Sequence, residues 1–117
     1  MQNKYKPKIS IIMNCHNGER YLKKSLRSIF CQSFKNWELI FFNNCSTDGS
    51  LNIINSFKDR RVKVYNSKKF LNLYDARNKA LKYAKGKYVS FLDADDQWNK
   101  NKLKIQFNFI IKKKLKF

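Results

Sequence analysis

Four short apolar runs alternate with four segments in which apolar residues recur at helical spacing, and this alternation limits the possible folds most strongly. The apolar runs cover residues 8–13, 37–42, 62–65 and 88–92, and the helical segments cover about residues 22–33, 51–57, 73–85 and 103–111. Strands that alternate with amphipathic helices of this length form right-handed crossovers and a mostly parallel sheet covered on both faces. We therefore predict an α/β fold.

The chain length fits one domain. A chain of 117 residues is too short for two domains, and its 43% apolar and 15% aromatic residues can build a core, so wholesale disorder is excluded. We predict a single domain over residues 1–117 with a Lys-rich helical tail at about 100–117. Asn17 is placed to cap the first helix, and Gly86 is placed to end the third.

The charge balance indicates an anionic partner. Lys and Arg number 26 against 8 acids, which gives a net charge of +18 and attracts nucleic acid, a phosphate-bearing small molecule or an anionic membrane. No apolar stretch reaches the ~20 residues of a membrane span, and no secretory signal is recognisable. The three cysteines have no CxxC spacing, which argues against a disulfide framework or a thiolate zinc site. We expect a cytoplasmic protein.

An acidic cluster follows the fourth apolar run, where parallel sheets bind ligands. Asp93, Asp95 and Asp96 are three of only 8 acids, and the carboxyl ends of such strands form binding sites where the strand order reverses. Clustered carboxylates suit Mg²⁺ or Mn²⁺, which complete their coordination with water and substrate phosphates. The alternative is a solvated turn in which Asp95 or Asp96 caps the last helix.

Two further side chains are candidates for ligand contact. Arg77 can make a forked contact with a phosphate, or it can be a solvent-facing helical residue. His16 is the only histidine, so a ring that stacks on a ligand base is a better interpretation than a metal ligand. Asp48 and Asp75 have the positions of turn or helix-start residues. No Gly-rich phosphate loop supports a P-loop or dinucleotide-binding interpretation.

Five stretches in order carry a resemblance to a known family. They are residues 8–19, 32–40, 44–48, 76–78 and 86–96. Together they resemble the N-terminal, nucleotide-sugar-binding half of family-2 glycosyltransferases with the GT-A fold, which is Rossmann-like. The opening Met-Asn-Cys-His-Asn-Gly is similar to bacterial members that build surface polysaccharides.

The resemblance implies a donor nucleotide held by two loops. Cys15, His16 and Asn17 fall in the first loop, where the family often places an aromatic ring against the base. Asn43 and Asn44 fall where members usually carry one or two Asp that contact base and ribose. Asn43 departs from the expected acid, which leaves a UDP-sugar favoured over other donors without fixing the base.

The resemblance also implies a metal-assisted donor site. Arg77 matches the donor-site arginine of the family, Asp95 matches the ligand that joins Mn²⁺ or Mg²⁺ to the diphosphate, and Asp93 matches its DxD partner, which reaches the ribose or sugar. Asp96 is an adjoining acid and a possible further ligand. The expected activity is glycosyl transfer, of a hexosyl or related sugar, in bacterial surface polysaccharide or glycoconjugate synthesis.

The resemblance covers about residues 8–105, whereas family members continue well beyond. Their second half supplies the acceptor pocket and the general base, so we expect this chain to be incomplete, with no catalytic base of its own. A saccharide or lipid-linked acceptor is implied, and no nucleic acid. The Lys-rich tail, with its apolar residues, is a candidate for contact with the anionic inner face of the membrane.

Two non-catalytic classes compete with this interpretation. A receiver-like regulatory domain is also α/β, but it needs acids after the first strand and an Asp after the third, where this chain has Asn14, His16 and Asn66. A basic nucleic-acid-binding module is consistent with the charge of +18 and with Phe and Tyr interleaved with Lys.

Overall fold

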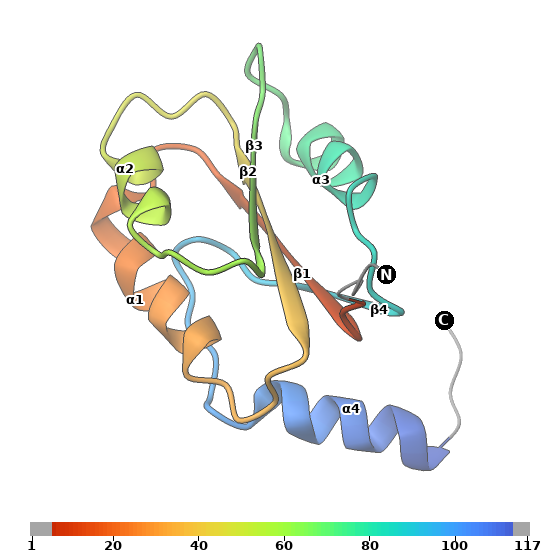
Figure 1. The fold of residues 1–117 in the computed structure, drawn as a ribbon. Helices are drawn as coiled ribbons and strands as arrows, with labels where there is room; N and C mark the ends of the chain where they lie inside the picture. Colours follow the sequence, from red (N-terminus) through yellow and green to blue (C-terminus); the bar gives the residue numbers. More distant parts are fainter. Residues whose placement is uncertain (1–5, 114–117) are drawn as a thin grey trace, which may run out of the picture.

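The chain forms a four-stranded sheet with helices packed on both sides (Figure 1) in a computed structural model that describes residues 6–113. In chain order the elements are β1 (Ile9–Cys15), α1 (Glu19–Phe30), β2 (Trp37–Asn43), α2 (Ser50–Asn55), β3 (Val62–Asn66), α3 (Leu73–Leu81), β4 (Tyr88–Phe91) and α4 (Lys102–Lys113). The strict alternation of strand and helix confirms the α/β prediction.

All neighbouring strands of the sheet are parallel, in the order β3-β2-β1-β4. β1 is paired on both sides, so that Ile12 lies beside Ile40 of β2 and beside Phe91 of β4. A strand buried between two neighbours and two faces must be apolar along most of its length, which explains the near-continuous apolar sequences of β1 and β2.

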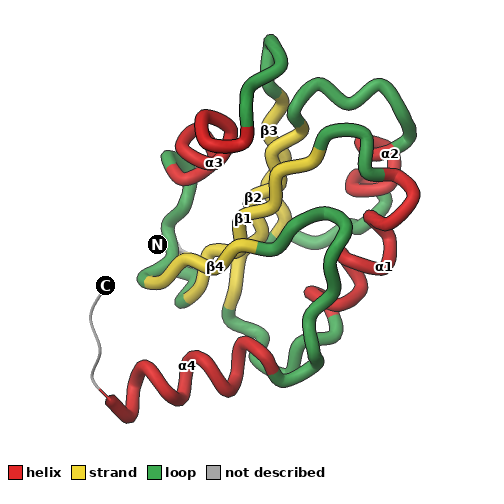
Figure 2. The backbone as a smooth tube through the Cα atoms, turned by 180° about the vertical axis from the view of Figure 1, so that it is seen from behind, coloured by secondary structure: helices red, strands yellow, loops and turns green. Residues whose placement is uncertain are grey.

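The two faces of the sheet are covered by different helices, as both views show (Figures 1 and 2). Ile11 and Met13 of β1 pack into the larger core with α1, α2 and the buried Leu103 of α4. Ile12 points to the other face, where it packs with Ala76 and Ala80 of α3. Because side chains alternate along a strand, one apolar run serves both cores.

Coverage of the sheet is incomplete at β4. Val89 and Phe91 share a face with Ile12, yet they are 41% and 43% exposed because α3 packs over β1 and β2. The expectation of a sheet covered on both faces therefore holds for its centre and not for this edge.

The last helix begins later than an acidic cap would require. The side chain of Gln32, from the loop after α1, accepts a hydrogen bond from the Leu103 amide (3.1 Å) and donates one to the Asn99 carbonyl (2.7 Å). These bonds anchor the start of α4 at Lys102, so neither Asp95 nor Asp96 caps it. The predicted tail is thus helical as far as Lys113, and residues 114–117 lie outside the described range. Among the described residues, no helix combines the length and apolarity needed to cross a bilayer.

Gly86 has a different role from the predicted one. The third helix ends at Leu81 rather than near residue 85, so Gly86 is not its C′ glycine. A Cβ atom added to Gly86 would lie 2.6 Å from the Ser10 amide nitrogen, and the Gly86 amide donates to the Ser10 hydroxyl (2.7 Å). That hydroxyl donates in turn to buried Glu38 (2.6 Å), which also accepts from the Lys85 amide (2.7 Å). Glycine is needed here because the entry to β4 passes close to the backbone of β1.

We predict that Gly86→Ala lowers the free energy of unfolding by about 1–3 kcal/mol, because the added methyl meets backbone that cannot move freely. Urea unfolding followed by circular dichroism measures the change. Gly49→Ala is the matched control: its Cβ would meet only the carboxylate end of the Glu19 side chain, at 2.8 Å, and that side chain can rotate away. Equal losses in the two variants would contradict the close-approach explanation.

Candidate donor-binding site

The order of the strands reverses at β1. The chain adds β2 and β3 on one side of β1 and then returns to place β4 on the other, which is the arrangement that opens a crevice at the carboxyl ends of the strands. The loops after β1 and β4 meet there: a Cβ on Gly18 would lie 3.4 Å from the Ala94 Cβ, and the Ser25 hydroxyl donates to the Asp93 carbonyl (3.2 Å). The structure therefore brings together two of the loops that the sequence identified.

Asn17 joins the loop after β1 to the loop after β2. Its side-chain oxygen accepts hydrogen bonds from the amides of Thr47 (2.7 Å) and Asp48 (3.3 Å), and its own amide donates to the Ser46 hydroxyl (2.9 Å). The prediction that Asn17 caps α1 is wrong, because Gly18 is the N-cap and makes no side-chain cap bond. Asn17 has φ = 53°, a left-handed conformation that asparagine tolerates better than most residues.

Asp48 also acts within these loops, as its predicted turn position implied. Its carboxylate accepts from the Glu19 amide (3.1 Å) and from the Ser50 amide (2.9 Å), across the starts of α1 and α2. Desolvation by itself raises the pKa of Asp48, but the hydrogen bonds from Ser50 and Glu19 outweigh it and hold the pKa below its usual value. Asp75 lies in the first turn of α3, as expected for a helix-start residue.

Asn43 and Asn44 are buried and engaged inside the protein. They are 6% and 5% exposed. The Asn43 amide group donates to the Asn66 side chain (2.9 Å) and accepts from the Ser46 amide (3.2 Å). The Asn44 side chain forms a pair of hydrogen bonds with the backbone of Leu71, at 2.7 and 3.0 Å. Their observed contacts therefore fix the loops after β2 and β3.

Cys15 lies at the end of β1 with its side chain in the core, only 1% exposed. Its carbonyl accepts from the Asn44 amide (2.8 Å), which ties β1 to the start of the next loop. The sequence placed Cys15 in the donor loop, and the structure places only its neighbours at the surface.

His16 is exposed at the crevice and held in one orientation. Its Nδ1 atom lies 2.7 Å from the Asn44 carbonyl, a geometry in which Nδ1 must carry the proton and donate. The ring meets Phe70 edge to face, with centroids 4.7 Å apart and planes at 68°. Phe70 was not identified from the sequence, although a single aromatic residue after two lysines in the loop before α3 was a signal that could have found it.

Arg77 and Asp93 come together from α3 and the end of β4. Arg77 Nη2 lies 3.5 Å from Asp93 Oδ1, and the guanidinium lies 5.2 Å from the centroid of the Phe91 ring. The side chains of Arg77 and Asp93 are 39% and 64% exposed, so both can reach a ligand. The sequence singled out these residues separately, and the fold places them at one site.

The acidic turn fits a metal ion that takes part of its coordination from a ligand. Asp93, Asp95 and Asp96 are all exposed, and the Asp96 amide donates to the Asp93 carbonyl in a tight turn. No group of three or more His, Cys, Asp or Glu within residues 6–113 is arranged to hold a metal. Mn²⁺ and Mg²⁺ commonly use one or two carboxylates together with phosphate oxygens, so a site of this kind is compatible with the residues present.

The side-chain oxygen of Asn14 adds an unsatisfied acceptor near this turn. It is buried and has no hydrogen-bond partner among the described residues. Asn14 lies two residues beyond Ile12, which pairs with Phe91, and therefore on the strand edge that faces the start of the acidic turn. Buried acceptors are normally satisfied, so a water or a ligand hydroxyl is the expected partner.

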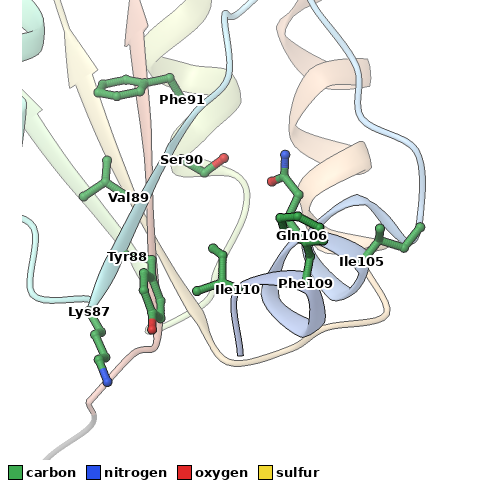
Figure 3. A pocket seen from close by; sticks show the side chains of 9 residues that line it. All are labelled: Lys87, Tyr88, Val89, Ser90, Phe91, Ile105, Gln106, Phe109 and Ile110. Atoms are coloured by element: carbon green, nitrogen blue, oxygen red, sulfur yellow. The ribbon is translucent and has the colours of Figure 1, made fainter. Parts of the chain in front are cut away.

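A separate hollow of about 800 Å³ lies between β4 and α4 (Figure 3). Its lining residues are Lys87, Tyr88, Val89, Ser90, Phe91, Ile105, Gln106, Phe109 and Ile110. It contains none of the residues that the sequence assigned to donor or metal binding. Its mainly apolar lining distinguishes it from the charged residues Arg77, Asp93 and Asp95 near the carboxyl ends of β1 and β4.

Comparison with solved structures identifies the class of fold as GT-A. TarS of Staphylococcus aureus in complex with UDP matches with a TM-score of 0.85 and 34% sequence identity, over 90% of this chain and 32% of that chain. The mannosyltransferase PcManGT of Pyrobaculum calidifontis, solved with GDP-Man and Mn²⁺, supports the fold at a TM-score of 0.82 and 22% identity, over 91% of this chain and 33% of its own.

The family follows from the sequence itself. The family model described as "Glycosyl transferase family 2" matches residues 10–116, and the chain belongs to this family. The Escherichia coli protein WfgD, a UDP-Glc:alpha-D-GlcNAc-diphosphoundecaprenol beta-1,3-glucosyltransferase, is 37% identical over 93% of this chain and 43% of its own length. TuaG of Bacillus subtilis, whose name refers to teichuronic acid biosynthesis, is 37% identical over 97% of this chain and 46% of its own.

Family membership removes one of the two non-catalytic classes that the sequence left open. A receiver-like regulatory domain is excluded by membership of the family. The chain spans less than half the length of these curated relatives.

We predict that Asn17→Ala destabilises the protein more than Asn17→Gly. Both variants remove the acceptor for the Thr47 amide, but alanine also pays about 1–2 kcal/mol for the left-handed conformation, which glycine adopts freely. Urea unfolding of the two variants gives the difference directly. An alanine variant at least as stable as the glycine variant would show that the backbone rearranges at this position.

Proposed function

We propose that this domain binds the nucleoside diphosphate of a nucleotide sugar in the crevice above β1 and β4 and supplies the donor half of a glycosyl transfer reaction. The observation that carries the proposal is the exposed group of Arg77, Asp93 and Asp95 at the point where strand order reverses, in a member of family 2. TarS, solved with UDP and with UDP-GlcNAc, supports a uridine-based donor.

The chemistry requires charge on the departing diphosphate to be balanced. Asp93 and Asp95 are the residues that would hold Mn²⁺ or Mg²⁺, and Asp96 is a further candidate because its side chain is exposed beside them. When bound, the metal ion stabilises the negative charge that develops on the diphosphate. Arg77 is placed to contact a phosphate oxygen on the same side of the crevice, with its guanidinium held over the Phe91 ring.

The buried asparagines have a supporting part in this proposal. Because Asn43 and Asn44 are bonded to Asn66 and Leu71, we assign them to positioning the loops rather than to reading the base. Cys15 and Asn17 also position these loops, because the Cys15 carbonyl accepts from the Asn44 amide and the Asn17 side chain accepts from the Thr47 amide. His16 remains the first-loop residue that can meet the nucleotide.

Support for a particular acceptor comes from the name of one relative. WfgD is named for a diphosphoundecaprenol-linked acceptor, which supports a lipid-linked saccharide as the acceptor and transfer of a hexose in polysaccharide synthesis. The expectation that the general base lies outside these residues stays a prediction.

We predict that UDP binding depends on a divalent ion and on Asp95. Changes to outer-shell partners of a metal already cost about 10–100-fold in affinity, so Asp95→Asn should weaken the binding of UDP with Mn²⁺ at least about 10-fold. Isothermal titration calorimetry with UDP and GDP, in Mn²⁺ or in EDTA, measures the dependence. Asp75→Asn, an exposed acid on α3, is the matched control and should bind like the original protein. Equal affinity in Mn²⁺ and EDTA would remove the metal from the proposal.

Contact with an anionic membrane is a second proposal, and it concerns α4. Ile105 and Phe109 are 64% and 53% exposed on this helix, and Lys104, Lys112 and Lys113 are exposed along it. A helix that presents apolar and basic side chains together can lie on a charged bilayer surface, where each lysine contributes about 1 kcal/mol.

We predict that the protein floats with vesicles of phosphatidylglycerol and phosphatidylcholine at low salt, and not with phosphatidylcholine alone. The double variant Lys112→Glu/Lys113→Glu should reduce the bound fraction at least about tenfold, because it reverses two charges. Lys23→Glu/Lys24→Glu on α1 makes the same change in net charge and should bind almost normally. Equal losses in the two double variants would show that net charge, rather than α4, drives the contact.

A further inference from the structure

Phe70 is a large apolar side chain that is 61% exposed in the loop between β3 and α3. The loop lies at the carboxyl edge of the sheet, and the Phe70 ring contacts His16 of the loop after β1. An exposed phenylalanine loses the free energy that burial would provide, and this one stands beside the crevice of the proposed donor site.

The backbone around Phe70 is held rigidly. The Ser67 amide donates to the Asn43 carbonyl (3.0 Å), and the Ser67 hydroxyl donates to the Lys69 carbonyl. On the other side, Leu71 is bonded through both its amide and its carbonyl to the buried Asn44 side chain. Ordered neighbours on both sides of Phe70 keep the exposed ring in place.

Asn44 also fixes the orientation of His16. The Asn44 carbonyl accepts from His16 Nδ1, so Asn44 positions one ring through its backbone and the other through its side chain. The two ring planes stand at 68°, which forms an open corner. A flat heterocycle that lies on the face of one ring presents its edge to the other.

The surroundings of the corner favour a ligand that joins a flat ring to a negative group. Lys68 and Lys69 are exposed immediately before Phe70, and their positive charge attracts a negative group. The faces of the two aromatic rings attract the π-system of a base. A nucleobase with an attached diphosphate has both properties.

We propose that Phe70 adds a second aromatic surface to the nucleobase site that the family resemblance implies at His16, and that Asn44 is the residue that positions both rings. The inference rests on the proposed function, since it assigns part of the same donor site. Base contact at Phe70 is made by stacking, which accepts different bases, so loss of the ring weakens UDP and GDP alike.

The test compares ligands with and without a base. Phe70→Ala should weaken the binding of UDP and GDP with Mn²⁺ about 10-fold, while the affinity for inorganic pyrophosphate with Mn²⁺ changes less than about twofold. Phe70→Trp should keep UDP affinity, and its fluorescence should change on addition of UDP but not of pyrophosphate. Phe109→Ala removes an equally accessible phenylalanine, 53% exposed on α4, and should leave all affinities unchanged.

The outcomes separate this inference from the proposed function. If the original protein fails to bind UDP, the proposed function is wrong and the inference with it. If it binds UDP and Phe70→Ala binds equally well, only the role of Phe70 is overturned. An equal loss for pyrophosphate and UDP in Phe70→Ala would likewise overturn stacking, because the ring would then act through the loop.

Asn44→Ala provides a second measurement of the positioning role. Hydrogen exchange at the Leu71 amide should accelerate, because its acceptor is removed, and UDP affinity should fall while pyrophosphate affinity is retained. Rapid exchange at Leu71 with unchanged UDP affinity would show that the loop does not need to be fixed for the base to bind.

Discussion

The pairing of β1 with β2 on one side and β4 on the other is the constraint on which the candidate donor site depends. Because β1 is bonded along both edges and buried on both faces, its carboxyl end can continue only into a loop that emerges between the two neighbouring strands. The chain crosses to opposite sides of β1, so the loops after β1 and β4 lie side by side at the carboxyl edge of the sheet. The hydrogen bonds of Asn17 to the Thr47 and Asp48 amides and of Ser25 to the Asp93 carbonyl hold these loops against their neighbours.

The polar residues of this edge fall into two groups with different physical roles. Asn43 and Asn44 are buried, and a buried amide must be hydrogen-bonded. Their hydrogen bonds therefore connect the loops after β1, β2 and β3. Asp93 and Asp95 are exposed, the Arg77 side chain is 39% exposed, and all three retain bonding capacity for a ligand. A rigid buried layer thus supports a charged surface layer, which is the arrangement that a preorganised binding site requires.

The net charge of +18 gives the acidic turn an unusual setting. Three carboxylates close together would repel one another, and the excess of lysine and arginine offsets part of that repulsion across the domain. The same field attracts a nucleoside diphosphate, whose charge would otherwise oppose the carboxylates. The metal ion in the proposed function completes this balance locally at Asp93 and Asp95.

The order of the elements, the parallel sheet and the position of the acidic turn could all be predicted from the sequence, because they follow from the period of the apolar residues and from scarce acids at a strand end. It also marked His16, the only histidine, and Arg77, whose guanidinium suits a forked contact with phosphate. The hydrogen bonds of Asn17, the close approach at Gly86 and the contact of Phe70 with His16 became visible only in the folded chain. Their partners are distant in the chain, as for Gly86 and Ser10, 76 residues apart, and no local pattern encodes a contact made by folding two separate segments together.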